Sequence, residues 1–292
     1  MHLKTKIEQG RFVVLAEVTP PKGTDTSAMI ATALPLKERV DAFVVSDMPN
    51  GVMRMSALCS ALILQNKGFE TLMQIGCRDR NRLAIQADLL GAGACGIGNL
   101  LAVNGEDPSF GDHHQALAVY DIDHLDLLYT IQCLQMGKDV AGGALEGAPQ
   151  FFTGSTVNPG LKGQAMELEV EKMNRRIDAG ARFFVTPPVF DLTAIEPFVS
   201  RIDHRKAHIM PTVLVLKSLG MARYIERHQK HIRIPPTLIR RIQSARDKPA
   251  ECLRIAGELV AEMQQQQFTG VSLSALGREH RIAEVLDLAA IH

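Results

Sequence analysis

The chain has 292 residues, 46% of them hydrophobic, and its 32 basic side chains balance its 32 acidic side chains. This balance leaves no basic face for nucleic acid or for a membrane surface, so we expect a small molecule or another protein as the partner. Residues 1–11 are too polar for a signal peptide, and no apolar run approaches the ~20 residues of a membrane span. The five cysteines are scattered, with no CxxC pair and an odd total. They argue against an internal metal cluster or a disulfide framework and favour the reducing cytoplasm.

Short apolar runs alternate with longer helical segments along the whole chain. Most of these runs are almost continuously apolar, as parallel strands are when helices cover both faces of their sheet. Between them, apolar residues recur at helical spacing, as in Leu125, Leu128, Ile131 and Leu134. The sequence therefore predicts eight strands, at residues 12–19, 42–46, 71–77, 99–104, 151–157, 183–186, 208–215 and 270–276.

This alternation predicts an α/β chain that closes into a (β/α)8 TIM barrel, as a single domain over residues 1–292. An open, doubly wound sheet is the alternative. Segments 105–121 and 137–150 are expected to be long loops, and segment 220–266 is expected to add helices before the last strand. Because TIM-barrel enzymes place the active site at the C-terminal ends of the strands, polar residues at those ends are the candidates for chemistry.

Gly91, Gly93 and Gly96 form a GxGxxG pattern, which in some proteins binds dinucleotides. Here the pattern ends a helix and precedes a strand, whereas the phosphate-binding version follows a strand and begins a helix. We therefore interpret Gly91 and Gly93 as glycines that stop a helix, and Gly180 in the same way.

Glu17 lies near the C-terminal end of the apolar first strand, three residues before the pair Pro20-Pro21 begins. A carboxylate in such a place must face the barrel mouth or be paired. One hypothesis is a structural salt bridge. The other is a carboxylic acid that donates a proton near neutral pH.

Two further groups of polar residues suggest a ligand site. Residues 104–108 (Asn-Gly-Glu-Asp-Pro) end the fourth strand in a turn with adjacent carboxylates, Glu106 and Asp107, which serves either as an ordinary turn or as a ligand contact. Lys172, Arg175 and Arg176 cluster near the end of a helix, where they either balance the helix dipole or bind a phosphate.

Glu17 with Pro20 and Pro21, the turn 102–108, and the segment 176–181 followed by Phe190 and Asp191 come in the order found in methylenetetrahydrofolate reductases. The chain resembles this family from Glu17 to the last strand. The resemblance implies a (β/α)8 barrel that contains FMN, with FAD as the alternative flavin. The implied activity is reduction of 5,10-methylenetetrahydrofolate to 5-methyltetrahydrofolate.

By position, the resemblance makes Glu17 the general acid, with Glu106 or its neighbour Asp107 as the second catalytic carboxylate near flavin and folate. Glu17, Asp107, Pro187 and Phe190 are the implied substrate-binding residues. The implied flavin-binding residues lie at strand ends and on one helix: Ser46, Gln74, Asn104, Gly105, Glu106, Asn158, Lys172, Arg175 and Arg176.

Several positions differ from the usual family pattern. Asn104 replaces an arginine, Gln74 and Asn158 replace histidines, and Pro187 replaces a glutamine that other members use on folate and nicotinamide. The loop 108–114 resembles the version found in anaerobic one-carbon pathways, where the reductase works beside a small iron–sulphur subunit. We therefore expect an iron–sulphur partner as the electron donor, with NADH and a homo-oligomer as the alternative.

Two other functions fit the same residues. A pterin-dependent methyltransferase barrel would use a carboxylate and asparagines in the mouth but no flavin. A non-catalytic barrel subunit of a redox complex would have no need of Glu17. The absorption spectrum of the purified protein discriminates between a flavoprotein and these alternatives.

Overall fold

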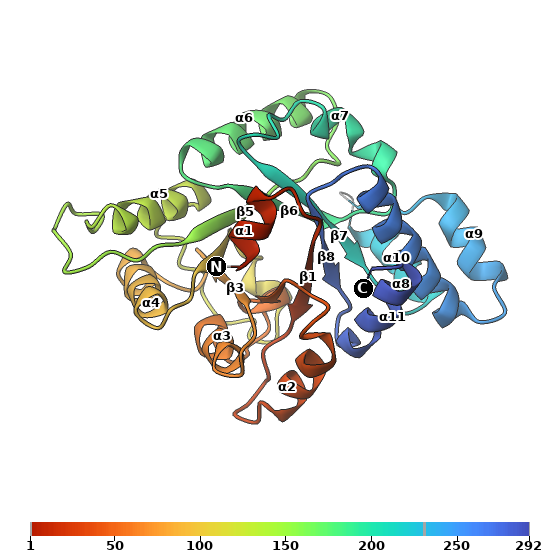
Figure 1. Cartoon of the computed structure of the whole chain (residues 1–292), viewed down its shortest axis with the longest axis horizontal. Helices are drawn as coiled ribbons and strands as arrows, with labels where there is room; N and C mark the ends of the chain where they lie inside the picture. Colours follow the sequence, from red (N-terminus) through yellow and green to blue (C-terminus); the bar gives the residue numbers. More distant parts are fainter. Residues whose placement is uncertain (1, 230–231, 292) are drawn as a thin grey trace.

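A computed structural model describes residues 2–229 and 232–291. Eight parallel strands form a closed barrel in chain order, and β8 pairs with β1 to complete it (Figure 1). This closure confirms the predicted TIM barrel and rules out the open, doubly wound sheet. The strands are β1 (Val13–Val18), β2 (Ala42–Val45), β3 (Thr71–Gly76), β4 (Asn99–Val103), β5 (Phe152–Thr156), β6 (Phe183–Pro188), β7 (His208–Leu214) and β8 (Gly270–Ser274).

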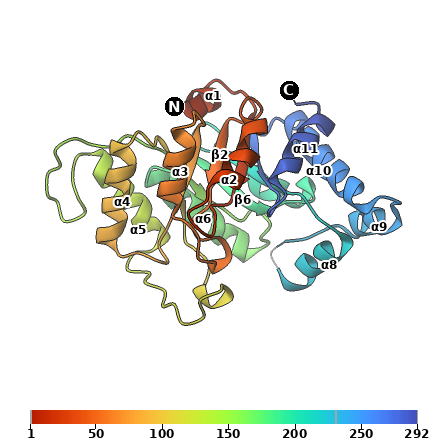
Figure 2. The same cartoon turned by 90° about the horizontal axis from the view of Figure 1, so that it is seen from below.

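Helices surround the barrel on the outside, except for α1 (His2–Glu8), which lies across one end of it (Figures 1 and 2). None of the described helices is long and apolar enough to cross a membrane. The other helices are α2 (Ser27–Ala33), α3 (Ala57–Gln65), α4 (Arg82–Ala94), α5 (His124–Gln135), α6 (Gln164–Asp178), α7 (Glu196–Val199), α8 (Leu219–His228), α9 (Pro236–Ser244), α10 (Lys248–Gln265) and α11 (Ile282–Leu288).

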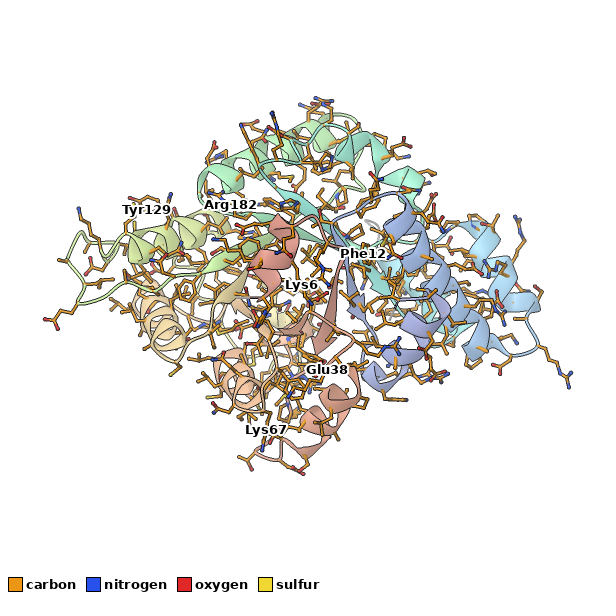
Figure 3. The ribbon with its side chains drawn as sticks, viewed as in Figure 1. Lys6, Phe12, Glu38, Lys67, Tyr129 and Arg182 are labelled. Carbon is orange, nitrogen blue, oxygen red and sulfur yellow. The ribbon has the colours of Figure 1, made fainter. Side chains whose placement is uncertain are left out.

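The barrel has a packed interior that α1 closes at the N-terminal ends of the strands. Leu3 and Ile7 of α1 belong to one buried apolar cluster with the inward-facing residues of the strands, such as Val13 and Leu15. Lys6 of α1, labelled in Figure 3, pairs with Asp41 just before β2. Since this end is sealed, the C-terminal ends of the strands form the open mouth, and the loops that follow them extend away from α1 (Figure 2).

The predicted loops and additional helices are present, and one strand is longer than predicted. Segment 105–121 contains a single short 3-10 helix (η3, Pro108–Phe110), and segment 220–266 contributes most of α8 and all of α9 and α10. β6 continues beyond the predicted residue 186 to Pro188, with a register shift between Val185 and Pro188. Proline has no amide hydrogen to donate to the neighbouring strand. Beside this shift, the Thr212 amide donates to the Thr186 hydroxyl at 3.1 Å.

One expected helix end is wrong. Gly91 and Gly93 lie inside α4, which continues to Ala94, and Gly96, with a φ of 82°, is the glycine that follows the helix end. Gly93 is required there for packing, because a Cβ atom on it would lie 2.5 Å from Pro149 Cβ of the loop 137–150. Gly180, with a φ of 102°, follows the end of α6 as expected.

Gly154 and Gly91 provide a paired test of the packing. A Cβ on Gly154 of β5 would lie 2.3 Å from the Phe183 ring, whereas a Cβ on Gly91 would meet nothing within 4 Å. We expect Gly154→Ala to lower the free energy of unfolding by about 1–3 kcal/mol through overpacking. Gly91→Ala should raise it by about 0.5–1 kcal/mol, because alanine favours the helix. Urea unfolding of both variants checks this, and an unchanged midpoint for Gly154→Ala would contradict the packing.

Candidate functional site

Glu17 faces the barrel mouth because side chains alternate along β1. Val13 and Leu15 point into the barrel interior, so Glu17, two residues further, points the same way at the open end. The Ser46 hydroxyl donates to Glu17 Oε1 over 2.6 Å, and the Ser274 hydroxyl donates to Oε2 over 2.5 Å. No cation lies within ion-pair distance of Glu17 among residues 2–229 and 232–291. Within the described part of the chain, Glu17 is therefore held by hydroxyl groups and forms no salt bridge.

Three adjoining clefts lie around the ends of β1 to β5 and β8. The first, the mouth cleft, has a volume of about 390 Å³, within the range of ligand pockets. It brings together residues that follow four different strands. Its lining comprises Glu17, Asp47, Met48, Pro49, Asn50, Gln74, Arg78, Val103, Asn104, Gly105, Glu106, Thr156 and Leu276.

The second, the basic cleft, has a volume of about 220 Å³ and is lined by Asn104, Asp123, His124, Leu125, Lys172, Arg175 and Arg176. Asn104 also lines the mouth cleft, so the two clefts adjoin at this residue. The third, the flank cleft, has a volume of about 450 Å³ and meets the mouth cleft at Glu17, Pro49, Asn50 and Leu276. Glu17 thus stands between two clefts.

The turn after β4 places its two adjacent carboxylates, Glu106 and Asp107, in different surroundings. Gly105 has a φ of 86°, and a Cβ atom there would lie 2.8 Å from Arg78 Cβ, so both the backbone and the packing require glycine. Glu106 is exposed and lines the mouth cleft. The Asp107 carboxylate instead accepts a bond from the Ser109 amide at 2.8 Å, and these local bonds hold the pKa of Asp107 below its usual value. The geometry therefore favours Glu106 over Asp107 as the second carboxylate of the mouth.

Arg78 is a buried residue of the site that the sequence analysis missed. Its guanidinium donates to the Glu106 carbonyl at 3.0 Å, to the Met48 carbonyl at 3.2 Å, and to both oxygens of Asp79. These bonds tie the loops after β2 and β4 to the end of β3. Met48 has a left-handed φ of 47°, a strained conformation for a residue other than glycine, and the bond from Arg78 helps to hold it.

A second buried ion pair lies directly behind the mouth. Arg80 pairs with Asp47 and, at 3.0 Å, with Asp88. Burial raises the pKa of Asp47, and the Arg80 charge opposes that rise. The Asp47 amide donates to Gln74 Oε1 at 3.2 Å, which orients the Gln74 side chain in the mouth cleft. The sequence feature that could have indicated these buried ion pairs is the series Arg78, Arg80 and Arg82, three cations that directly follow an apolar strand.

The three cations of α6 divide between two tasks. Arg176 is largely buried and donates to the Thr156 carbonyl at 2.8 Å and to Glu169 at 3.2 Å, so its charge is already paired. Lys172 and Arg175 are exposed, line the basic cleft, and have no ion-pair partner among the described residues. Burial lowers the pKa of His124 to about 4, with a contribution from Arg176, so His124 is neutral in the cleft wall at neutral pH.

Asn158, Pro187 and Phe190 lie apart from the other sequence-predicted residues. They line a narrow cleft, distinct from the mouth cleft, between the loop after β5 and the end of β6. Phe190 is only 4% exposed and packs into the apolar layer outside the barrel. Ser46, by contrast, lies in contact with Glu17.

The family model described as methylenetetrahydrofolate reductase matches residues 2–290. The chain belongs to the methylenetetrahydrofolate reductase family. The match covers all eight strands and therefore every residue of the three clefts. No curated protein matches the chain.

Solved structures with the same fold have low sequence identity to this chain. An uncharacterized protein from Clostridium thermocellum that binds two copies of 5-methyl-5,6,7,8-tetrahydrofolic acid has a TM-score of 0.67 at 16% identity, over 99% of this chain and 100% of that one. EDTA monooxygenase from Chelativorans sp. BNC1 has a TM-score of 0.58 at 12% identity, over 96% and 94% of the two chains. A 2,3-dimethylmalate lyase has a TM-score of 0.52 at 9% identity, over 99% and 82%. These similarities show a shared barrel.

Proposed function

We propose that this chain reduces the methylene bridge of 5,10-methylenetetrahydrofolate to a methyl group, with FMN as its flavin and Glu17 as the general acid. The observation that carries the proposal is a carboxyl group held by two hydroxyls at the junction of two clefts, in a member of this family. A barrel of the same fold binds 5-methyl-5,6,7,8-tetrahydrofolic acid, which supports a folate as the ligand here.

The mouth and basic clefts fit FMN in shape and charge. A flat ring suits the mouth cleft, where Gln74 and the Thr156 hydroxyl supply polar contacts. A phosphate suits the basic cleft, because Lys172 and Arg175 form no ion pair among the described residues, and the Asp123 carboxylate of the cleft accepts bonds from the Leu125 and Asp126 amides instead. Asn104, which lines both clefts, would contact the chain between ring and phosphate. FAD, the alternative, would need room for an adenosine beyond these cations.

Bound FMN in its reduced form would supply the hydride. Glu17 would give its proton to N10 of the substrate as the bond from N10 to the bridging carbon breaks, and the carbon, still attached to N5, takes the hydride to become a methyl group. Serine hydroxyls both donate and accept, so Ser46 and Ser274 can hold the Glu17 carboxyl before and after it loses the proton. The Glu106 carboxylate would favour positive charge on the substrate as the bridge opens.

Glu17→Gln keeps the shape of the side chain and removes the proton. We expect the reoxidation of reduced enzyme by methylenetetrahydrofolate to slow by roughly 10²–10⁴-fold, the usual range for a positioned general acid. Reduction of the flavin should be nearly unchanged, and Glu38→Gln, which alters an exposed glutamate before β2, should leave both half-reactions unchanged. Stopped-flow absorbance measures the two half-reactions separately. An equal loss in both would show that Glu17 is structural.

Lys172→Ala combined with Arg175→Ala should weaken FMN binding. Losing two charged contacts to a phosphate should raise the dissociation constant at least about 10-fold. Arg176 is left in place because it holds Glu169 and the Thr156 carbonyl. Fluorescence titration with FMN measures the constant, and Arg205→Ala with Lys206→Ala is the matched control at two exposed cations. An unchanged constant would place the phosphate elsewhere, and a protein that binds no flavin would favour the methyltransferase or non-catalytic alternatives.

The electron donor is proposed to be an iron–sulphur partner protein. No three His, Cys, Asp or Glu side chains are grouped to hold a metal ion within residues 2–229 and 232–291, so a cluster would come from the partner. The GxGxxG glycines lie within and after α4, away from any phosphate-binding turn. The loop after β4 exposes Phe110 (81%) and Leu117 (90%) near the mouth, as a docking surface would.

Anaerobic mixing of the purified chain with NADH tests this donor. We expect slow bleaching of the flavin absorbance, and faster bleaching when a co-purifying iron–sulphur protein is added. Rapid bleaching at physiological NADH would instead support the alternative donor, with NADH bound over the flavin and a homo-oligomer as the working form.

A further inference from the structure

The balanced total charge of the chain conceals two segments of opposite charge. Residues 217–248 carry nine of the 32 basic side chains and two acidic ones, whereas residues 83–161 carry nine acidic side chains and one basic one. The first segment includes α8 and α9, and the second includes α4 and α5. In both views these two pairs of helices lie at opposite ends of the molecule (Figures 1 and 2). The fold thus separates positive from negative charge along its longest axis.

The basic hairpin, formed by α8 and α9, presents exposed arginines. Arg223, Arg227 and Arg240 form no ion pair within the described part of the chain. Arg223 and Arg227 are four residues apart and therefore lie on one face of α8, and Arg223 donates across to Gln243 of α9 at 3.2 Å. Tyr224 beside them is 62% exposed. Because tyrosine and arginine are enriched at binding hot spots, this surface has the composition of an interface.

The carboxylates near the basic hairpin neutralise little of its charge. Asp247 accepts a bond from the Ala250 amide at 3.0 Å and so begins α10. Glu226 lies on α8 itself and balances at most one of the three arginines. The hairpin therefore keeps a net positive charge, contrary to the expectation from the balanced total that the chain has no basic face.

The acidic face, formed by the outer sides of α4 and α5 and by segment 137–150, has an apolar centre. Four exposed residues of α4 share one side of the helix, at a spacing of four, three and four: Leu83, Ala87, Leu90 and Ala94. Tyr129 and Met136 of α5 are 55% and 62% exposed, and Tyr129 is labelled at this end of the molecule in Figure 3. Exposed apolar side chains gathered in this way mark an interaction site.

Carboxylates border this apolar centre. Three of them form no ion pair among the described residues: Asp126, Asp139 and Glu146. Arg82, at the start of α4, is paired with Asp121 at 2.8 Å, and Lys138 is the one basic residue of segment 83–161. The free charge of the acidic face is therefore mainly negative.

We infer that the acidic face of one copy of this chain binds the basic hairpin of a second copy. The two surfaces lie at opposite ends of one molecule, so the contact joins different copies head to tail (Figures 1 and 2). Two acidic faces in contact with each other would bring like charges together, which disfavours a symmetric dimer through this face. In the head-to-tail contact, Tyr224 meets the apolar centre and the arginines meet the bordering carboxylates. The inference is independent of the reaction that the chain catalyses.

Sedimentation equilibrium of the purified chain measures this association. Because salt screens charges at a surface, we expect the dissociation constant to rise at least about 10-fold between roughly 0.05 M and 0.5 M salt.

Two triple variants reverse the charge of one end each. The first replaces arginines of the basic hairpin, so that both ends become negative: Arg223→Glu, Arg227→Glu and Arg240→Glu. The second adds cations to the acidic face, so that both ends become positive: Leu83→Lys, Tyr129→Lys and Glu146→Lys. Each triple variant alone should associate at least about 10-fold more weakly than the unaltered chain. An equimolar mixture of the two should associate again, because each variant presents the surface that the other lacks.

Arg11→Glu with Lys67→Glu is the matched control, because these two exposed cations lie outside both surfaces. It should leave the association unchanged, and circular dichroism checks that every variant is folded. An unaltered chain that stays monomeric at low salt, or an association that neither triple variant weakens, would overturn the inference. Two weakened variants whose mixture does not associate would overturn it as well, because the two surfaces would then not bind each other. None of these outcomes bears on the proposed function.

Discussion

The site depends on closure of the barrel between its first and last strands. β1 pairs with β2 on one side and with β8 on the other, and the side chain of Glu17 at the end of β1 accepts a hydroxyl bond from each neighbour, Ser46 and Ser274. Any shift of register by one residue would turn Glu17 to the outside of the barrel. The inward packing of Val13 and Leu15 beneath it makes such a shift costly, so the apolar interior fixes the carboxyl group.

Buried guanidinium groups give the mouth its shape. The Arg78 side chain is 3% exposed. It donates hydrogen bonds to Asp79 and to the carbonyl groups of two loops, so its charge and its hydrogen-bonding capacity are largely satisfied within the protein. Arg80 does the same for Asp47 and Asp88 behind the mouth. Removing either partner would leave an unpaired charge, which costs more than the pair itself contributes. The loops that line the mouth cleft are therefore held by the end of β3, while Lys172 and Arg175 of the basic cleft form no ion pair among the described residues.

The pattern of the sequence was sufficient for the strands but less so for the details around them. Near-continuous apolar runs identified all eight strands, because both faces of a parallel barrel are covered. The end of α4 was misplaced, because Gly93 is required by its close contact with Pro149, which comes from a distant loop that no local pattern records. Arg78 was missed for a similar reason, because the Glu106 and Met48 carbonyls to which it donates lie 28 and 30 residues away in the sequence.

The sequence by itself determined the barrel, the strand-end position of Glu17, and the family, because strand composition, the side-chain alternation of two and a linear order of motifs are all local properties. Only the tertiary structure decided which polar residues meet. It brought Glu17 together with Ser274, 257 residues later, directed Glu106 rather than Asp107 to the mouth, and separated Pro187 and Phe190 from it. These outcomes follow from barrel closure, loop packing and ion pairing between distant segments, and no local pattern in the chain records them.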